Sequence, residues 1–333
     1  MKAMVLDMIA DIGTSPLALR DLPDPEPGFG EVRLKVHRCA ICRTDLHVIE
    51  GDLPQAKLPV IPGHQVVGTV DRLGPGCDRL AVGRRIGIAW LRHTCGTCKF
   101  CATGRENLCV DPRFTGYHAD GGYAEFAVVP EAFAYELPEV FEDAEATPLL
   151  CAGIIGYRAL ERSRLPAGGT LAIYGFGSSA HIVMQIARHR GCEVYVVTRG
   201  ESHRRLAREM GAKWVGENAS DMPVPVESAI LFAPAGELVP VALSKLEHGG
   251  TLALAGIHMS PIPTLDYELL FHERNVHSVT ANTRADGRAL LAEAATIPIR
   301  PRITSYSLAD ANRALQDLKA DRINGTGVLV GGE

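Results

Sequence analysis

Four cysteines between positions 95 and 109 form the strongest chemical signal in the chain. They follow the pattern C-x2-C-x2-C-x7-C. Four thiolates at such short spacing close a tetrahedral Zn2+ site and leave no position for water or substrate. A loop of free thiols is the alternative, but it does not account for the spacing. The pattern therefore predicts a structural zinc bound by Cys95, Cys98, Cys101 and Cys109.

The chain also contains ligand types for a second zinc with an open position. A catalytic zinc takes three protein ligands and leaves the fourth position to water or substrate. Cys42, His64 and Cys151 are candidates. Their spacing does not select them, and without further information all three are better explained as core residues. Cys151 follows the β-rich part of the chain, where we expect cofactor and substrate to converge.

A glycine-rich turn follows a predicted strand at 169–174 and precedes a predicted helix. In this context Gly175 permits a tight turn and Gly177 lets the backbone approach a pyrophosphate. Ser178 and Ser179 begin the helix, whose N–H groups and dipole favour phosphate. The alternative is a glycine-rich turn that binds nothing. The strand, turn and helix in this order predict a dinucleotide site.

The end of the next predicted strand, 193–198, bears on the choice of cofactor. NAD sites usually have Asp or Glu here, which would repel a 2′-phosphate. This strand ends in Thr198 and is followed by Arg199, a pair that favours NADP. An arginine at this position can equally stack on adenine, so NAD stays open. Ser202 is predicted to cap the helix that follows.

The length of 333 residues suggests two domains. Residues 1–151 are rich in Gly and Pro, with short alternating strands, and predict a compact β-rich domain. Residues 152–282 alternate strands and helices, which predicts a parallel sheet wound on both faces. Residues 283–333 add two helices and a final strand. The predicted fold class is therefore α/β plus β.

Composition excludes several classes of function. The net charge is −5 and no basic tract is present, which argues against nucleic acid as a partner. No apolar run approaches the ~20 residues of a membrane span, and Asp7 interrupts any signal-peptide pattern. The nine cysteines are clustered and odd in number, which favours metal-bound thiolates over a disulfide framework. We expect a cytoplasmic protein that binds a small molecule.

Taken together, these motifs resemble the zinc-dependent alcohol dehydrogenases of the medium-chain dehydrogenase/reductase superfamily. The resemblance covers essentially the whole chain and is greatest to the bacterial, yeast-like primary-alcohol group. It implies a GroES-like catalytic domain (1–151), with a structural-zinc lobe at about 92–112. It also implies a Rossmann domain (152–282) and a return to the catalytic domain (283–333). The matching segments are 39–47, 63–70, the four-cysteine lobe, 121–125, 150–153 and the glycine loop.

The resemblance assigns roles to individual residues. Cys42, His64 and Cys151 would bind the catalytic zinc. Thr44 would hydrogen-bond the alcohol oxygen and start a proton relay that ends at His47. Asp45 would orient His64 by a hydrogen bond to its other ring nitrogen. Further residues implied to contact the cofactor are Arg43, Ala255 and Ile257, and those implied to line the substrate pocket are Leu53, Trp90, Tyr117 and again Ile257.

The implied reaction is hydride transfer between a primary alcohol or aldehyde and NAD or NADP, with two zinc ions per subunit. The pocket residues suggest unbranched or aromatic primary alcohols. The resemblance also implies a homo-oligomer, a dimer or tetramer, paired at the sheet edge near 276–280. Gln65 stands where the family commonly has Glu. The alternatives are an aldehyde reductase of different specificity, or a nucleotide-binding protein with an altered, poorly active site.

Overall fold

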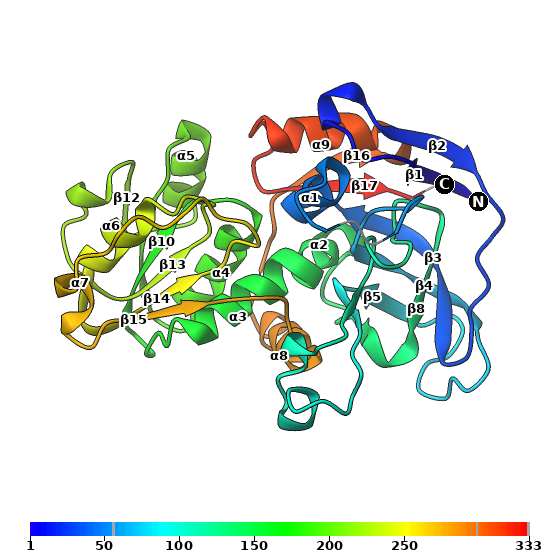
Figure 1. Cartoon of the computed structure of the whole chain (residues 1–333), viewed down its shortest axis with the longest axis horizontal. Coiled ribbons are helices and arrows are strands. Elements are labelled where there is room, and N and C mark those ends of the chain that lie inside the picture. The colour runs from blue at the N-terminus through cyan, green and yellow to red at the C-terminus, as the bar shows by residue number, and fades with distance from the viewer. Residues whose placement is uncertain (55–56, 298, 332–333) are drawn as a thin grey trace. The chain divides into compact units, whose positions relative to one another are not determined.

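The computed structural model describes residues 1–54, 57–297 and 299–331. Contacts within this part of the chain divide it into two units, each with its own sheet (Figure 1). The first unit comprises residues 1–151, 281–295 and 301 onward, and the second comprises 152–280 and 296–300. In the described ranges, no helix combines the length and the apolar character that crossing a membrane requires.

The first unit is organised around a largely antiparallel sheet. The strands are hydrogen-bonded in the order β16-β17-β3-β4-β5-β9, and β8 pairs with β3. One face of the central strand is apolar, and its residues Val32, Leu34 and Val36 are buried. On the other face Lys35 is exposed, whereas Arg33 is covered and paired with Asp71. The strands are β3 (Glu31–Ala40), β4 (Gln65–Leu73), β5 (Arg85–Ile88), β8 (Phe126–Pro130), β9 (Ala134–Glu136), β16 (Ile303–Ser307) and β17 (Thr326–Val330).

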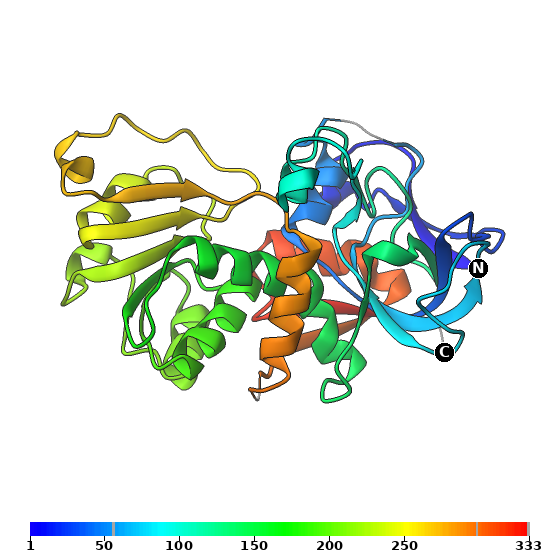
Figure 2. The same ribbon diagram turned by 90° about the horizontal axis from the view of Figure 1, so that it is seen from below.

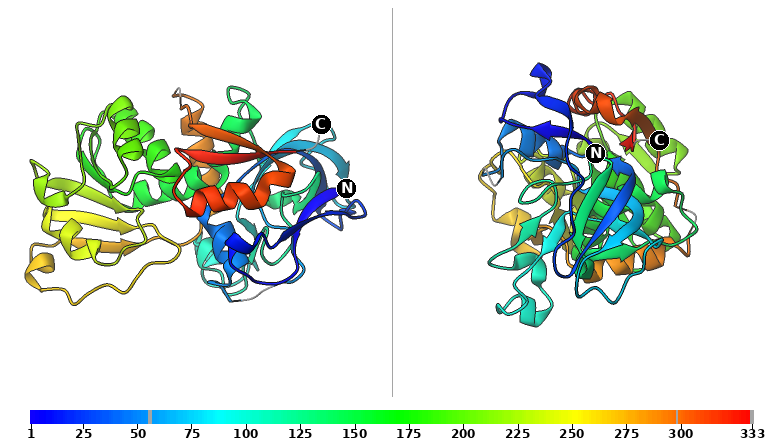
Figure 3. Two further views of the ribbon diagram at one scale, coloured as in Figure 1. Left: turned by 90° about the horizontal axis from the view of Figure 1, so that it is seen from above. Right: turned by 90° about the vertical axis from the view of Figure 1, so that its right-hand side faces the viewer.

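Helices and short ribbons surround this sheet. The C-terminal helix α9 packs against β16 and β17, as Figure 3 shows in its left view. The ribbons are β1 (Lys2–Leu6) with β2 (Leu17–Asp21), and β6 (Leu91–His93) with β7 (Arg113–Phe114). The helices of this unit are α1 (Arg43–Glu50), α2 (Asp143–Pro148), α8 (Arg284–Ala294) and α9 (Ala311–Lys319).

The second unit contains a parallel sheet in the order β12-β11-β10-β13-β14-β15. Counted along the chain this is 3-2-1-4-5-6, the order of dinucleotide-binding folds, which reverses between β10 and β13. The predicted doubly wound sheet is confirmed. Its strands are β10 (Thr170–Tyr174), β11 (Glu193–Val197), β12 (Trp214–Gly216), β13 (Val226–Leu231), β14 (Leu246–Leu254) and β15 (Asn275–Ser278).

Both faces of the parallel sheet are buried. Ala172 and Tyr174 pack in one apolar cluster with residues of α6. Leu171 and Ile173, which point to the other face, are also fully buried, and α3 and α4 run side by side there (Figure 2). The helices are α3 (Ile154–Arg162), α4 (Ser178–His189), α5 (Glu201–Glu209), α6 (Leu238–Ser244) and α7 (Glu268–Phe271).

One predicted helix start is wrong. Ser202 was expected to cap the helix after β11, but α5 begins at Glu201 and its N-cap is Gly200. Arg204 donates hydrogen bonds to the carbonyls of Thr198 and Arg199, at 3.4 and 2.6 Å. These bonds hold the turn before the helix closed, so that the helix starts earlier than a serine cap would place it.

Candidate active site

Helix α1 begins at a candidate zinc ligand. Cys42 is its N-cap, and the cysteine Sγ accepts a hydrogen bond from the Thr44 N–H at 3.3 Å. The Asp45 carboxylate accepts one from the Cys42 N–H at 2.9 Å, which completes a capping box. The helix ends at Glu50 and is capped by Gly51, whose positive φ of 81° suits glycine. The start of α1 therefore fixes Cys42, Thr44 and Asp45 relative to one another.

The structure brings Cys42, His64 and Cys151 together. Their ligand atoms all lie within 4.8 Å of one another, and His64 Nε2 is 3.3 Å from Cys151 Sγ. Zinc bonds of the usual length put a sulfur and a nitrogen ligand roughly 3.6 Å apart. Cys151 lies in a π-helical turn, Leu149–Gly153, that widens the helix between α2 and α3. The donor set therefore fits a zinc ion with one position left for a further ligand.

Electrostatics at this site favour a metal. Asp45 Oδ1 lies 3.0 Å from His64 Nδ1, which leaves Nε2 to face the two sulfurs. A hydrogen bond from the Cys151 thiol, with His64 beside it, lowers the pKa of Cys42 well below its usual value. Burial opposes the charge on His64, but Asp45 and Cys42 outweigh it and raise the His64 pKa to about 10. Zinc binding would displace this proton.

The predicted relay residues lie on one face of α1. Thr44 and His47 are three positions apart, so their side chains project from the same side of the helix. His47 Nδ1 lies 2.8 Å from Asp52 Oδ2. The Asp52 N–H also bonds to the His47 carbonyl at 3.0 Å, because the chain folds back at Gly51. His47 is partly exposed and therefore has access to solvent.

Trp90, one of the predicted pocket residues, lies beside His64. The ring of Trp90 meets the His64 ring edge-on, with centroids 4.9 Å apart. Tyr117 stacks on Trp90 at 5.8 Å, and its hydroxyl donates to the carbonyl of Pro54, the residue after Leu53. These contacts give the candidate zinc site an aromatic wall.

The four cysteines of the lobe converge as predicted by their spacing. The Sγ separations are 3.5 Å for Cys95–Cys109, 3.6 Å for Cys98–Cys101 and 4.0 Å for Cys95–Cys101. Tetrahedral zinc places its sulfur ligands about 3.8 Å apart. Backbone N–H groups, first that of Cys101, lower the pKa of Cys98 to about 6 and so favour the thiolate. The lobe fits a zinc ion with no open position.

An ion pair anchors the lobe to the rest of the first unit. Glu106, between the last two cysteines, accepts bonds from the guanidinium of Arg284 at 2.6 to 3.1 Å. It also accepts the Arg284 N–H at 2.7 Å, at the start of α8. The guanidinium also lies over the ring of Phe133, 4.4 Å from its centroid. The Glu106 side chain is nearly buried, so this paired arrangement satisfies its charge.

The glycine loop of the second unit has the geometry of a phosphate cradle. Gly175 has a φ of +85°, and a Cβ there would lie 3.0 Å from the backbone nitrogen of Ala233. A Cβ on Gly177 would instead project into open space, which a phosphate can use. Ser178 and Ser179 form the first turn of α4, which contains no acidic residue. The loop therefore fits a pyrophosphate.

The other predicted cofactor residues lie at the ends of β11 and β14. Thr198 is buried and Arg199 exposed just after β11. Arg204 is engaged by the two carbonyls named above and by carboxylates, whereas Arg199 is exposed to solvent. After β14, Ala255 is held by a hydrogen bond to Leu231, and Ile257 is half exposed. Arg43, the first residue of α1, is exposed.

Comparison with known proteins identifies the family. Residues 28–139 match the family model for the Alcohol dehydrogenase GroES-like domain, and 180–296 match the model for Zinc-binding dehydrogenase. The chain is 53% identical over 323 residues to a protein of Mycobacterium tuberculosis named "Probable alcohol dehydrogenase AdhA", covering 95% of this chain and 93% of the relative. The chain belongs to the zinc-dependent alcohol dehydrogenases. It is thus an oxidoreductase of alcohols and aldehydes that uses a nicotinamide cofactor.

Two further relatives agree with this family. An "Alcohol dehydrogenase" of Geobacillus stearothermophilus is 34% identical over 322 residues, covering 94% of this chain and 95% of the relative. A crystal structure of AibC superimposes with a TM-score of 0.91 at 31% identity, covering all of this chain and 96% of that one. The resemblance inferred from the motifs is therefore confirmed, and so is the fold class.

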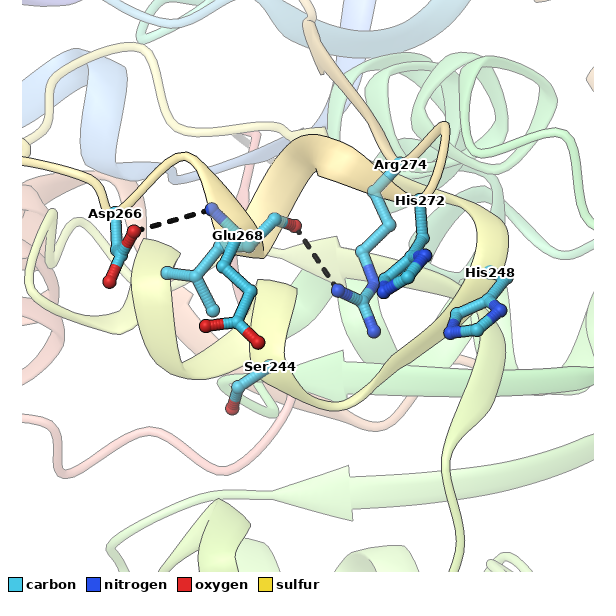
Figure 4. A pocket seen from close by; sticks show the side chains of 7 residues that line it. Ser244, His248, Asp266, Glu268, His272 and Arg274 are labelled. Atoms are coloured by element: carbon cyan, nitrogen blue, oxygen red, sulfur yellow. Dashed lines mark hydrogen bonds between the residues drawn. The ribbon is translucent and has the colours of Figure 1, made fainter.

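A hollow on the second unit of this alcohol dehydrogenase takes no part in the predicted site (Figure 4). Its two histidine rings stack on each other at 3.9 Å, and Arg274 donates to the carbonyls of Leu246 and Leu269. No predicted site residue lies among its lining residues, and we assign it no role in catalysis. The lining residues are Ser244, His248, Asp266, Glu268, Leu269, His272 and Arg274.

Three side chains near the predicted sites of this dehydrogenase were missed from the sequence. Asp52 contacts the relay histidine, Arg204 shapes the turn after β11, and Tyr123 contacts Asp45. Asp52 follows the helix stop Gly51, a signal that could have placed it near the end of α1. Tyr123 lies in the segment 121–125, which the resemblance had singled out without a role.

Proposed function

We propose that this enzyme oxidises primary alcohols, and reduces the corresponding aldehydes, at a zinc ion held by Cys42, His64 and Cys151. The convergence of these three side chains, with Asp45 behind His64, carries the proposal. A second zinc would be held by Cys95, Cys98, Cys101 and Cys109, giving two per subunit.

Residues of the chain would carry the alcohol proton from the substrate to solvent. A zinc ion at the three ligands would lower the pKa of the alcohol hydroxyl, and the nicotinamide would accept the hydride. Thr44, two residues after Cys42, would accept the hydroxyl proton through its side-chain oxygen. From Thr44 the proton would pass along the same face of α1 to His47, which is partly exposed and contacts Asp52. In aldehyde reduction the proton would travel in the opposite direction.

NADP is the proposed cofactor. No carboxylate stands at the end of β11, where Thr198 and Arg199 are found. The nearby acids Glu201 and Glu217 bond to Arg204, at 3.0 and 2.8 Å, which offsets their negative charge. An exposed Arg199 is then available to a 2′-phosphate. The pyrophosphate would lie at Gly177 and the start of α4, with Arg43 as a further cation and Ala255 and Ile257 near the nicotinamide end.

Unbranched and aromatic primary alcohols are the proposed substrates. Leu53, Trp90 and Tyr117 are apolar or aromatic, and Trp90 contacts the ring of His64 directly. Such a wall offers few partners to the extra hydroxyl groups of a polyol.

We also propose a cellular location, an oligomeric state and domain boundaries for the enzyme. A location in the reducing cytoplasm would keep the nine cysteines as thiols, and six of them, four in one and two in the other, belong to the two candidate metal groups. A homo-oligomer, dimer or tetramer, would pair at the exposed edge strand β15. We propose that residues 1–151 and 283–333 form the catalytic domain and residues 152–282 the nucleotide-binding domain.

A rate assay tests the proposed function. Zinc-replete protein is supplied with a panel of primary alcohols, with NAD+ and NADP+ in parallel, and nicotinamide reduction is followed. Cys42→Ser should abolish turnover and remove one zinc, because a serine hydroxyl is a poor zinc ligand but still caps a helix. Cys77→Ser is the matched control, since Cys77 belongs to neither candidate metal group and its thiol donates to the carbonyl of Glu31.

Each outcome has a definite meaning. Turnover that disappears in Cys42→Ser but persists in Cys77→Ser supports the ligand assignment, and the ratio of rates with the two cofactors decides between NADP and NAD. Full activity in Cys42→Ser would refute the zinc mechanism. Wild-type protein that binds two zinc ions and nucleotide but turns over no alcohol would support the altered-site alternative.

A further inference from the structure

A buried tyrosine hydroxyl lies behind the candidate zinc ligand His64. Tyr123 Oη donates a hydrogen bond to Asp45 Oδ2 at 3.0 Å, and both side chains are almost inaccessible to solvent. The same carboxylate oxygen accepts the Cys42 N–H at 2.9 Å, while Oδ1 faces His64 Nδ1 at 3.0 Å. Burial raises the pKa of Tyr123, so the hydroxyl keeps its proton and remains a donor.

The ring of Tyr123 is itself held against the chain that leads into His64. Gly63 has a φ of +95°, and a Cβ there would lie 2.3 Å from Tyr123 Cδ1, so the ring packs directly on this glycine. The Tyr123 N–H donates to the Pro62 carbonyl at 3.0 Å, and its own carbonyl accepts from Met4 at 2.8 Å. Tyr123 therefore contacts both the backbone before His64 and the carboxylate beside its ring.

We propose that Tyr123 is a positioning residue for the catalytic zinc, acting through Asp45 on His64. The proposal rests on the zinc site described under the proposed function. Asp45 has two fixed donors on Oδ2, and together they set the plane of the carboxylate so that Oδ1 points at Nδ1. With Nδ1 held, Nε2 faces the two sulfurs, where a zinc ion would take the place of its proton. Without the tyrosine hydroxyl, only the Cys42 N–H would orient Oδ2.

The expected magnitude follows from residues that play this kind of role in other metal sites. Removing a hydrogen-bond partner of a ligating histidine typically weakens metal binding by 10- to 100-fold. Tyr123 is one hydrogen bond further from the metal site than Asp45. We therefore expect Tyr123→Phe to weaken zinc binding at this site by about tenfold, at the lower end of that range. The zinc of the four-cysteine lobe should be unaffected.

The experiment compares Tyr123→Phe with Tyr135→Phe in the full chain. Tyr135 is a second buried tyrosine of the first unit, whose hydroxyl accepts a long hydrogen bond, at 3.4 Å, from Asn282. Zinc content per chain is measured first, and zinc loss to a chelator is then followed with a metal indicator. We expect two zinc ions per chain in all three proteins. One should leave Tyr123→Phe about ten times faster than it leaves wild type or Tyr135→Phe.

Cobalt substitution provides a second signal that overall stability does not determine. The cobalt–thiolate absorption bands report the geometry around Cys42 and Cys151, and they should shift in Tyr123→Phe but not in Tyr135→Phe. If Tyr123→Phe does not fold, 3-fluorotyrosine at position 123 keeps the shape and makes the hydroxyl a stronger donor. Slower zinc loss than in wild type is then expected, and an equal rate would overturn the proposal.

The experiment distinguishes a failure of the proposed zinc site from a failure of the proposed role of Tyr123. A wild-type chain that binds zinc only at the lobe overturns the proposed catalytic zinc site itself. Two zinc ions in wild type, with equal release from Tyr123→Phe and Tyr135→Phe, overturns the role of Tyr123 and leaves the site intact. Faster loss of both zinc ions from Tyr123→Phe, with unchanged cobalt bands, also overturns it, because that pattern indicates a general loss of stability.

Discussion

Acid should destabilise the second unit through one buried histidine. His181 lies in the first turns of α4, is inaccessible to solvent, and has its Nδ1 3.2 Å from the carbonyl of Gly177. Burial lowers the pKa of His181 from 6.5 to about 4. The folded unit therefore keeps this ring neutral over most of the acid range. The perturbation we propose is His181→Gln, which removes the titrating group and suits a helix.

The magnitude follows from the two pKa values. Between pH 6.5 and 4 the unfolded chain binds a proton at this position that the folded chain does not, so lowering the pH favours unfolding. The difference between 6.5 and about 4 corresponds to about 3 kcal/mol of unfolding free energy. Above pH 6.5 neither state is protonated here, and this contribution to stability is fully present. Wild type should thus lose about 3 kcal/mol more than His181→Gln between pH 7 and pH 4.

The two tryptophans allow each unit to be followed separately. Trp90 is in the first unit and Trp214, in β12, is in the second. Urea unfolding is monitored by Trp214 fluorescence in a Trp90→Phe background, with and without His181→Gln, from pH 7 to pH 4. In the converse background, Trp214→Phe, the Trp90 signal reports the first unit and serves as the control.

Three results would refute the reasoning. Parallel stability curves for wild type and His181→Gln across the whole pH range would mean that His181 titrates alike in both states. A similar divergence in the Trp90 signal would place the effect outside the second unit. A direct titration of the His181 ring by NMR gives the folded pKa independently, and a value near 6.5 would contradict the structural argument.

Three further predictions concern the lobe, the cofactor and the relay. Glu106→Gln should destabilise the first unit by about 2 kcal/mol in urea unfolding, since the charged bonds to Arg284 are lost. The pKa of Glu106 is lowered even though burial opposes its charge, because Arg284 outweighs burial. The advantage of wild type should therefore persist at neutral pH and disappear once acid protonates Glu106. Arg199→Leu should raise KM for NADP+ at least about tenfold and leave KM for NAD+ nearly unchanged, as an Arg–phosphate pair predicts; equal changes for both cofactors would indicate stacking on adenine. Asp52→Leu should lower kcat roughly tenfold, a fraction of what a complete acid–base group supplies, with KM unchanged; an unaltered pH–rate profile would exclude Asp52 from the relay that includes His47.

The lobe and the parallel sheet could be predicted from local patterns. All four lobe cysteines lie within fifteen residues, so the convergence of their sulfur atoms is encoded by spacing alone. The parallel, doubly wound character of the second sheet likewise follows from strands and helices that alternate along the chain. In both cases the interacting residues are close in sequence or repeat regularly.

The candidate catalytic zinc could not be derived in this way. His64 and Cys151 are 87 residues apart, and only the folding of the sheet around Gly63 and the π-helical turn brings them to 3.3 Å. The resemblance to the family identified Cys42, His64 and Cys151 as candidate ligands, which their spacing in the sequence could not do. Tyr123 was missed because its proposed role depends on a packing contact with Gly63. The two residues are 60 positions apart, and no motif in the sequence indicates that they touch.

The capping box at the start of α1 has a consequence for how metal enters the site. The bonds that place Cys42 and His64 are made between protein groups: Thr44 N–H to sulfur, and Asp45 to both the Cys42 N–H and His64. None of them requires the metal. Binding to such a preorganised site costs little conformational entropy, so most of the metal–ligand interaction energy remains available as affinity. Zinc uptake should therefore be possible in the folded enzyme, without passage through an unfolded chain.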